Sequence, residues 1–141
     1  MIRVIVAGSR TFTNYEFVEK MLKKYFKEHN IRKSDVEIIS GTARGADQLG
    51  EQFAEKYGLK LTKFPADWNN LGKKAGIIRN IEMVKYAIEN EDNILFAFWD
   101  GQSRGTQHII NESKKYNIKT LVYTENEWGI KYEQNIFIAK W

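Results

Sequence analysis

An apolar run breaks into a loop of small residues in Ile38-Ile39-Ser40-Gly41-Thr42-Ala43-Arg44-Gly45-Ala46-Asp47, and an amphipathic pattern follows immediately. This order is typical of a strand, a phosphate-sized loop and a helix that begins near Arg44. Gly41 and Gly45 allow the backbone to turn sharply and to approach a ligand, and the helix start offers free N–H groups to an anion. Two glycines at this spacing also occur in ordinary strand-to-helix connections.

The same order recurs in Phe98-Trp99-Asp100-Gly101-Gln102-Ser103-Arg104-Gly105-Thr106, where an apolar strand ends in glycine and Arg-Gly opens a second helix. A repeat of this kind within one small domain favours a binding role over two ordinary connections. We therefore expect phosphate groups of a ligand to lie against both loops.

Length and composition limit the possible classes of protein. The 141 residues are enough for one domain with a sizeable core, and we expect that domain over residues 1–125. No apolar run approaches the roughly 20 residues that cross a bilayer, and no signal peptide is evident, so we expect a cytoplasmic protein without a membrane role. The chain has no cysteine and two histidines, so we expect neither a disulfide framework nor a metal site. We also expect no bound cofactor.

The charge of the chain permits nucleic-acid binding but does not favour it. The net charge is +4, and the Lys and Arg residues are interleaved with 18 acidic residues instead of forming a basic tail. Most lysines fall on expected helix faces that point to solvent. Four arginines instead stand at loop or helix-start positions, where a guanidinium group suits bidentate contact with phosphate: Arg10, Arg44, Arg79 and Arg104.

Strand and helix patterns alternate along the chain. We expect strands at residues 3–7, 36–40, 59–64, 93–99 and 118–123 and helices between them. Thr13-x-x-Glu16 has the spacing of a capping box before a helix over residues 14–29, and Ile77, Ile81, Val84 and Ile88 are expected to face inward on the helix that follows Gly76. This alternation predicts an α/β, three-layer, Rossmann-like fold with a mainly parallel five-stranded sheet.

In such a fold a ligand binds beyond the carboxyl ends of the strands, where the strand order reverses. The loop at residues 8–13 lacks the dinucleotide fingerprint, so nicotinamide or flavin binding is not expected. Asp67 and Trp68 follow the single proline in what we expect to be a loop. The expected ligand-binding residues are Gly8, Ser9, Arg10, Ser40, Gly41, Thr42, Arg44, Gly45, Asp47, Asp67, Trp68, Arg79, Asn80, Trp99, Asp100, Gly101, Ser103, Arg104, Gly105 and Thr106.

Five motifs in this order resemble the YspA-like branch of the SLOG superfamily, which is named for the Smf/DprA proteins and the LOG enzymes. They are Gly8-Ser9-Arg10, Ser40-Gly41-x-x-Arg44-Gly45-Ala46-Asp47, Pro65-Ala66-Asp67-Trp68, Gly76-x-x-Arg79-Asn80-x-x-Met83 and Trp99-Asp100-Gly101-x-Ser103-Arg104-Gly105-Thr106. The similarity spans roughly residues 3–123. It implies a Rossmann-like fold and a site for a nucleotide or a nucleotide-derived signal. Relatives include phosphoribohydrolases, single-strand DNA binders and sensors of ADP-ribose-type messengers.

One departure from the LOG enzymes weakens the interpretation as a hydrolase. Those enzymes carry a catalytic glutamate three residues after the Gly-Thr of their phosphate loop, and Ile109 occupies that place here. Asp47, Asp67 or Asp100 could supply an acid instead, although Asp47 could also cap its helix and Asp100 could order its loop. We therefore rank binding of a nucleotide signal first, nucleotide hydrolysis second and single-strand nucleic-acid binding third.

The resemblance ends at residue 124, before an aromatic-rich extension over residues 126–141 that contains Trp128, Phe137 and Trp141. This extension could add an edge strand or bury itself in a partner subunit. Because relatives of this superfamily are commonly homo-oligomers, we expect a dimer or a larger assembly.

Overall fold

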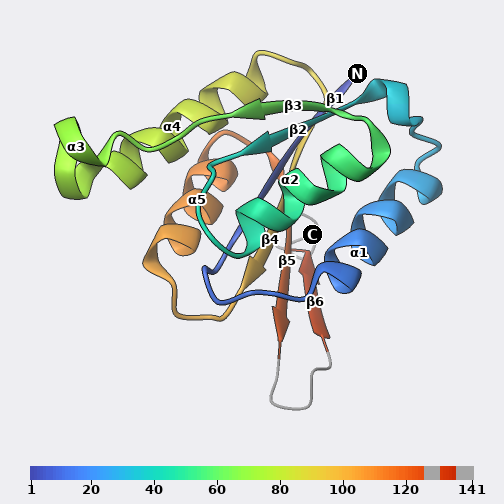
Figure 1. The fold of residues 1–141 in the computed structure, drawn as a ribbon. Helices are drawn as coiled ribbons and strands as arrows, with labels where there is room; N and C mark the ends of the chain where they lie inside the picture. The colour runs from blue at the N-terminus through green and yellow to red at the C-terminus, as the bar shows by residue number, and fades with distance from the viewer. Residues whose placement is uncertain (126–130, 136–141) are drawn as a thin grey trace.

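The computed structural model, which describes residues 1–125 and 131–135, contains one six-stranded sheet in the order β3-β2-β1-β4-β5-β6 (Figure 1). Each of the first five strands pairs in parallel with its neighbours, and only β6 is antiparallel, against β5. The strands are β1 (Ile2–Gly8), β2 (Val36–Ser40), β3 (Lys60–Lys63), β4 (Asn93–Trp99), β5 (Lys119–Glu125) and β6 (Lys131–Asn135). The predicted Rossmann-like architecture with five parallel strands is confirmed.

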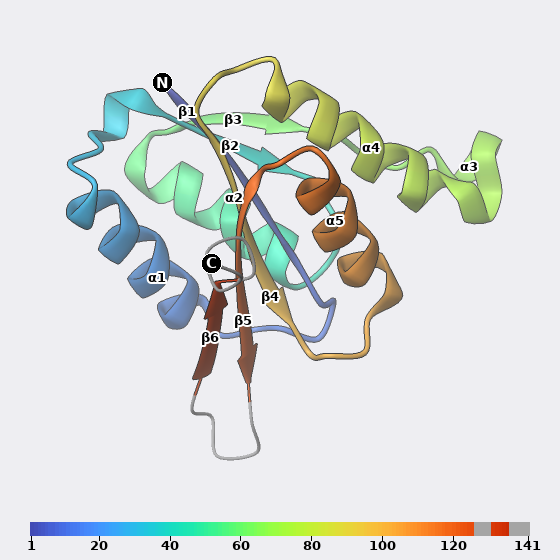
Figure 2. The ribbon, with the colours of Figure 1, turned by 180° about the vertical axis from the view of Figure 1, so that it is seen from behind.

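The helices are α1 (Tyr15–Glu28), α2 (Ala46–Tyr57), α3 (Trp68–Leu71), α4 (Ala75–Ile88) and α5 (Arg104–Lys115), with short 3-10 turns η1 (Lys33–Asp35) and η2 (Gly72–Lys74). Figures 1 and 2 show α3 projecting beyond the sheet next to the start of α4. Among the described residues, no helix is long and apolar enough to cross a membrane.

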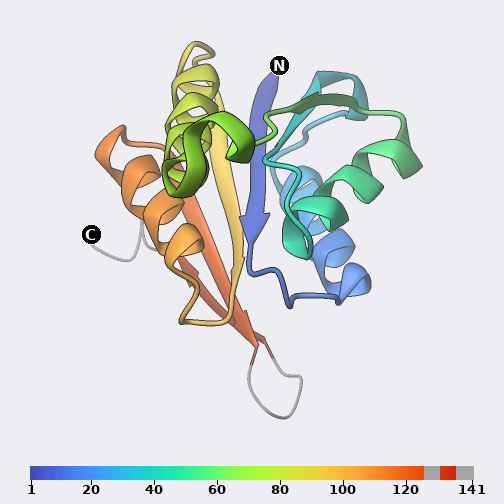
Figure 3. The ribbon, with the colours of Figure 1, turned by 60° about the vertical axis from the view of Figure 1, so that its left-hand side comes forward.

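The sheet lies between two helical layers, with α1 and α2 on one face and α4 and α5 on the other (Figure 3). Alternation along β1 divides its side chains between the two layers: Val4 and Val6 join the cluster under α1 and α2, and Ile5 and Ala7 join the cluster under α4 and α5. The central strands are buried on both faces, which explains their nearly continuous hydrophobic sequence.

Two helix starts differ from the sequence prediction. The N-cap of α1 is Asn14, whose Oδ1 accepts a hydrogen bond from the Phe17 N–H at 3.1 Å, so the predicted Thr13 capping box is wrong. Asparagine is as good an N-cap as threonine, and the pattern alone placed the cap one residue early. The helix α2 begins at Ala46 instead of near Arg44, because Gly45 has a φ of 81° and stands as its N-cap.

The buried face of α4 also differs from the prediction. Val84 is buried as expected, but Ile77 and Ile88 are exposed and Asn80 and Met83 take inward positions. The amphipathic pattern gave the wrong inward face because it assigns polar residues to solvent, whereas Asn80 is buried and its Nδ2 donates to the Gly105 carbonyl at 3.2 Å. Asp67 and Trp68 also differ from the expected loop, because Asp67 caps α3 and Trp68 begins it.

Part of the C-terminal extension adds an edge strand to the sheet. Residues 131–135 pair with β5 in a register that sets Leu121 opposite Asn135 and Glu125 opposite Lys131. Trp128, Phe137 and Trp141 lie outside the described residues, so an oligomer contact through them stays a prediction. The same holds for the expected domain boundary at residue 125.

Candidate functional site

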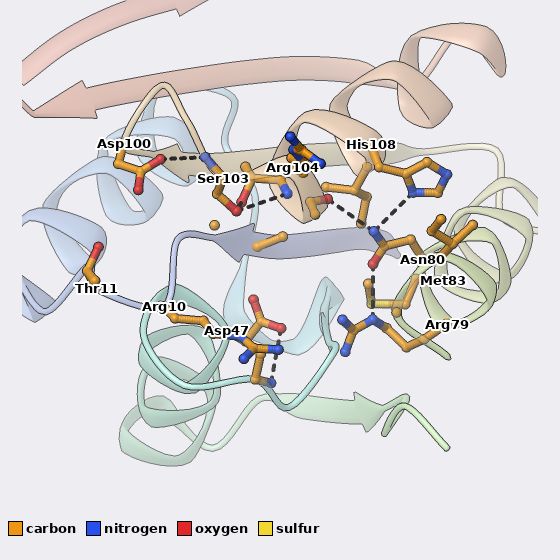
Figure 4. A pocket seen from close by; sticks show the side chains of 18 of the residues that line it. Arg10, Thr11, Asp47, Arg79, Asn80, Met83, Asp100, Ser103, Arg104 and His108 are labelled. Carbon is orange, nitrogen blue, oxygen red and sulfur yellow. Dashed lines mark hydrogen bonds between the residues drawn. The ribbon is translucent and has the colours of Figure 1, made fainter. Parts of the chain in front are cut away.

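A cavity of about 480 Å³ opens at the carboxyl ends of the parallel strands. The strand order reverses between β1 and β4, and the cavity lies there, walled by the β1–α1 loop, the β4–α5 loop and the first turns of α4 and α5. Figure 4 shows Ser103, Arg104 and His108 on one side, Asp47 facing them, and Arg79, Asn80 and Met83 at one end. This is the position at which open α/β sheets bind ligands.

The N-terminus of α5 forms one wall of the cavity. Ser103 caps the helix by accepting from the Thr106 N–H at 3.4 Å, while the Asp100 carboxylate accepts from the N–H groups of Gln102 and Ser103, both at 2.8 Å. These loop contacts hold the pKa of Asp100 below its ordinary value. The first turn leaves the N–H groups of Arg104 and Gly105 without an intrahelical partner.

Gly105 gives that wall its open surface. A Cβ placed on Gly105 would meet nothing within 4 Å, although the residue lines the cavity. The backbone at this turn is therefore accessible to an incoming group. Gly8 differs, because a Cβ there would stand 2.0 Å from the Phe98 carbonyl oxygen, so it is glycine for strand packing.

The opposite wall holds a buried carboxylate. Asp47 is 4% exposed, accepts from the Ala43 N–H at 3.2 Å and faces the guanidinium of Arg79. Burial raises the pKa of Asp47 to about 6, against the opposing effects of Arg79 and of backbone N–H groups. The buried position also lowers the pKa of Arg79, although Asp47 opposes that change. Burial therefore disfavours the charged forms of both the carboxylate and the guanidinium, and their mutual attraction offsets this desolvation cost only in part.

Gly41 makes room for this pair. Its carbonyl accepts from Arg79, and a Cβ on Gly41 would stand 2.7 Å from the guanidinium and 2.8 Å from the Asp47 carboxylate. The Gly41–Ala46 loop is thus filled largely by the protein's own groups. The Ser9 carbonyl adds to this filling by accepting from the Ala46 N–H at 3.2 Å. The Ser9 Oγ instead accepts from the Asp100 N–H at 2.9 Å and so ties the end of β1 to the start of the β4–α5 loop.

A chain of hydrogen bonds runs from Arg79 along the end of the cavity. Arg79 Nε donates to Asn80 Oδ1 at 3.0 Å, and Asn80 Nδ2 lies 3.2 Å from His108 Nδ1. His108 Nε2 stands 3.7 Å from a carboxylate oxygen of Glu112. If His108 Nδ1 accepts from the amide, the ring proton lies on Nε2 and faces Glu112. The network fixes the side chains at this end of the cavity.

The mouth of the cavity is cationic and aromatic. Arg10, Lys73 and Arg104 are exposed there, and among the described residues none of the three is in an ion pair. Trp68, which is 49% exposed, stands at the same mouth, with the Arg10 guanidinium 6.0 Å from the centre of its ring.

The structure brings most of the expected binding residues to the cavity. Those that line it are Gly8, Arg10, Asp47, Trp68, Arg79, Asn80, Asp100, Ser103, Arg104, Gly105 and Thr106. Those that do not are Ser9, Ser40, Gly41, Thr42, Arg44, Gly45, Asp67, Trp99 and Gly101. Several residues of the second group form hydrogen bonds that hold the loops next to the cavity. Ser40 Oγ, for example, donates to Glu51 at 2.7 Å and accepts from the Thr42 N–H at 3.0 Å.

Other lining residues were not among the expected binding residues, although Gly76, Met83 and Ile109 stand in or beside the quoted motifs: Ala7, Thr11, Ala43, Lys73, Gly76, Ile77, Met83, His108 and Ile109. His108 could have been found, because it lies one helical turn after Arg104 and therefore on the same face of α5. Lys73 carried no such signal, since η2 and its orientation were not predicted. Of the described residues, no group of three or more His, Asp or Glu side chains could hold a metal ion.

The three candidate acids occupy different settings. Asp67 accepts from the Asn70 N–H and side-chain amide, and Asp100 accepts from its own loop, so both carboxylates hold local structure. Asp47 alone among them is a buried carboxylate on the cavity wall with a raised pKa. Ile109, at the place of the LOG glutamate, is buried and lines the cavity with an apolar side chain.

Comparison with known proteins relates the chain to a protein family and to a phage protein. Residues 2–70 match the family model YAcAr, described as the YspA, cpYpsA-related SLOG family. The chain is also 32% identical over 126 residues to the Gene 61 protein of Mycobacterium phage D29, with 86% of this chain and 95% of that protein covered. The α4 and α5 walls of the cavity lie beyond residue 70, so their assignment depends on the geometry above.

Proposed function

The chain belongs to the YspA, cpYpsA-related SLOG family, and from this membership and the cavity we propose that it binds a phosphorylated nucleotide or nucleotide-derived signal. The ligand class is that of ADP-ribose-like molecules or cyclic nucleotides, and the protein acts as a sensor or a sequestering protein. One observation carries the proposal: the accessible first turn of α5 faces a cavity whose mouth holds three cations that form no ion pair with the described part of the chain.

Phosphate fits the α5 wall on electrostatic grounds. The positive end of the helix dipole, the free N–H groups of Arg104 and Gly105 and the Arg104 guanidinium all favour an anion at one place. Arg10 and Lys73 increase the positive potential at the mouth, whereas Arg79 is already balanced by Asp47. We therefore favour the first turn of α5, with Arg104 and Gly105, over the Gly41–Ala46 loop as the phosphate site.

An aromatic ring fits the mouth of the cavity next to α3. Trp68 and Ile77 line the cavity and are 49% and 50% exposed, so both present apolar surface to an incoming ligand. A nucleobase stacked on the Trp68 indole would cover this surface and leave its phosphates directed toward α5.

Asp47 favours a second candidate function, hydrolysis of the bound nucleotide. A carboxyl with a pKa of about 6 can exchange a proton near neutral pH, and it lies on the cavity wall. Binding ranks ahead of hydrolysis because Asp47 is already engaged by Ala43 and Arg79. Chromatography of ligand incubated with the protein separates the two: intact recovery supports binding, and base release that Asp47→Asn abolishes supports hydrolysis.

The binding proposal is tested by calorimetric titration with ADP-ribose, AMP and adenosine. We expect the two phosphorylated probes to bind and adenosine to bind at least tenfold more weakly, because it lacks the charge-assisted contacts. Arg104→Ala should weaken ADP-ribose binding by tenfold or more without loss of folding stability.

Arg44→Ala is the matched control for that titration. Arg44 also precedes a glycine at a helix start, but it is exposed and does not line the cavity. We expect unchanged affinity in this variant. Equal affinities in Arg104→Ala and the parent protein, or equal affinities for ADP-ribose and adenosine, would contradict the proposed phosphate site.

A further inference from the structure

A second cavity, of about 350 Å³, lies between α1, η1 and α2. It is located at the amino ends of the strands, whereas the first cavity lies at their carboxyl ends. Two of its lining residues show this position, because Val36 is the first residue of β2 and Leu59 precedes β3. The volume falls within the roughly 300–1,000 Å³ typical of small-molecule sites. Its apolar lining consists of Phe26, Ile31, Val36, Phe53, Tyr57 and Leu59.

Three lysines surround this apolar lining. Lys23, Lys27 and Lys33 are exposed, and none of the described residues that line the cavity is acidic. Lys23 and Lys27 stand four residues apart on α1, where two like charges destabilise a helix. None of the three lysines forms an ion pair with the described part of the chain.

Two of the ammonium groups converge on one ring. Lys23 Nζ lies 5.4 Å and Lys33 Nζ 5.6 Å from the centre of Tyr57, although the two residues come from different elements. The ring is held in place because the Tyr57 hydroxyl donates to Glu19 at 2.9 Å. Glu19 is itself paired at 2.7 Å with Lys56, whose ammonium group also lies 5.4 Å from the centre of the Tyr57 ring, so the charge of Glu19 is already balanced.

We propose that this second cavity binds a small organic anion with an apolar body, such as a medium-chain carboxylic acid. The carboxylate lies between Lys23 and Lys33 beside Tyr57, and the hydrocarbon part contacts Phe26 and Phe53. Charge complementarity selects an acid over an amine or an alcohol of the same length, and the apolar lining selects a hydrocarbon body over a free inorganic anion.

The site is independent of the proposed nucleotide site. The two cavities share no lining residue and lie at opposite ends of the strands. Failure of one proposal therefore leaves the other standing, and a variant of one site serves as a control for the other.

The test follows backbone amide signals of isotopically labelled protein by NMR during titration with sodium decanoate below its micelle concentration. We expect saturable shifts at residues around Phe26, Phe53 and Tyr57, and no comparable shifts with decyltrimethylammonium. The double variant Lys23→Glu/Lys33→Glu should weaken decanoate binding by tenfold or more. Lys24→Glu is the matched control, because Lys24 is an exposed neighbour on α1 that does not line the cavity.

Several results would overturn the proposal. They are no saturable binding of decanoate, equal binding of decyltrimethylammonium, or equal affinity in the double variant, which would indicate non-specific apolar adsorption. Loss of decanoate binding in Arg104→Ala would move the site to the first cavity. A concentration-dependent molecular mass that only the double variant abolishes, without decanoate binding, would assign the surface to a second copy of the chain. If the double charge reversal does not fold, Lys23→Ala/Lys33→Ala replaces it in the same titration.

Discussion

Asp47→Asn should stabilise the protein at neutral pH, even though it alters a hydrogen-bonded residue in the predicted site. The ordinary pKa of 3.8 for an aspartate rises to about 6 for Asp47 in the folded protein. At 1.36 kcal/mol for each pH unit, this difference corresponds to about 3 kcal/mol. Asparagine has nearly the same shape and can still accept from the Ala43 N–H, but it carries no charge to bury.

The sign of the pH dependence follows from the direction of the pKa change. Between the unfolded and folded pKa values the folded protein keeps a proton on Asp47 that the unfolded chain has released. The stabilisation linked to this proton is complete below about pH 4 and is lost as the pH rises through about 6. The attraction of Arg79 for the ionised carboxylate is already included in this balance, because it lowers a pKa that nevertheless stays raised.

Urea unfolding of both proteins from about pH 4 to about pH 8 measures the effect. We expect equal free energies of unfolding near pH 4 and an advantage of about 3 kcal/mol for Asp47→Asn near pH 8. Asp100→Asn is the matched control with the opposite sign, because its loop lowers the pKa of Asp100. A variant of Asp47 that is less stable than the parent at pH 8, or a difference in stability that does not change with pH, would show that burial of the Asp47 charge is not a net cost to the folded protein.

Three further changes test separate features of the structure. Gly105→Ala should fold with unchanged or slightly higher stability, by up to about 1 kcal/mol in urea unfolding. It should nevertheless weaken ADP-ribose binding in calorimetry, because the added methyl group covers an open part of the backbone that lines the first cavity. Unchanged affinity would contradict phosphate binding at the first turn of α5. Asn14→Ala should lower the free energy of unfolding in urea by about 0.5–2 kcal/mol, and Thr13→Ala should lower it much less. A larger loss for Thr13→Ala would indicate that Thr13 caps α1 after all. Deletion of residues 126–141 should lower the molecular mass measured by light scattering, since it removes β6 and the aromatic extension; an unchanged oligomeric mass would show that the extension packs only within its own chain.

The layers of the fold could be predicted because local pattern and tertiary environment agree in the central strands. β2 matches its expected range, Val36–Ser40, and β4 matches Asn93–Trp99, since strands buried on both faces are rich in apolar and β-branched residues. The end of α2 was equally predictable, because Gly58 adopts a φ of 66° as its C-cap. The position of the cavity follows from strand order, which right-handed crossovers restrict strongly.

The remaining features depend on contacts between segments that are distant in sequence. The inward face of α4 includes Asn80 because the Gly105 carbonyl, 25 residues later, accepts its amide proton. The two Arg-Gly loops look alike in sequence, but only Arg104 lines the cavity, since Gly41 and Asp47 fill the other loop together with Arg79. A pattern within one segment carries no information about such partners.

Mass spectrometry of small molecules released from the natively purified protein tests the proposed nucleotide binding most directly. We expect a phosphorylated nucleotide-type compound that is released intact on denaturation from the parent protein and from Arg44→Ala, and that is depleted in Arg104→Ala. Recovery of a nucleotide in equal amounts from the Arg104→Ala variant, or of only unphosphorylated compounds from the parent protein, would contradict the proposed binding.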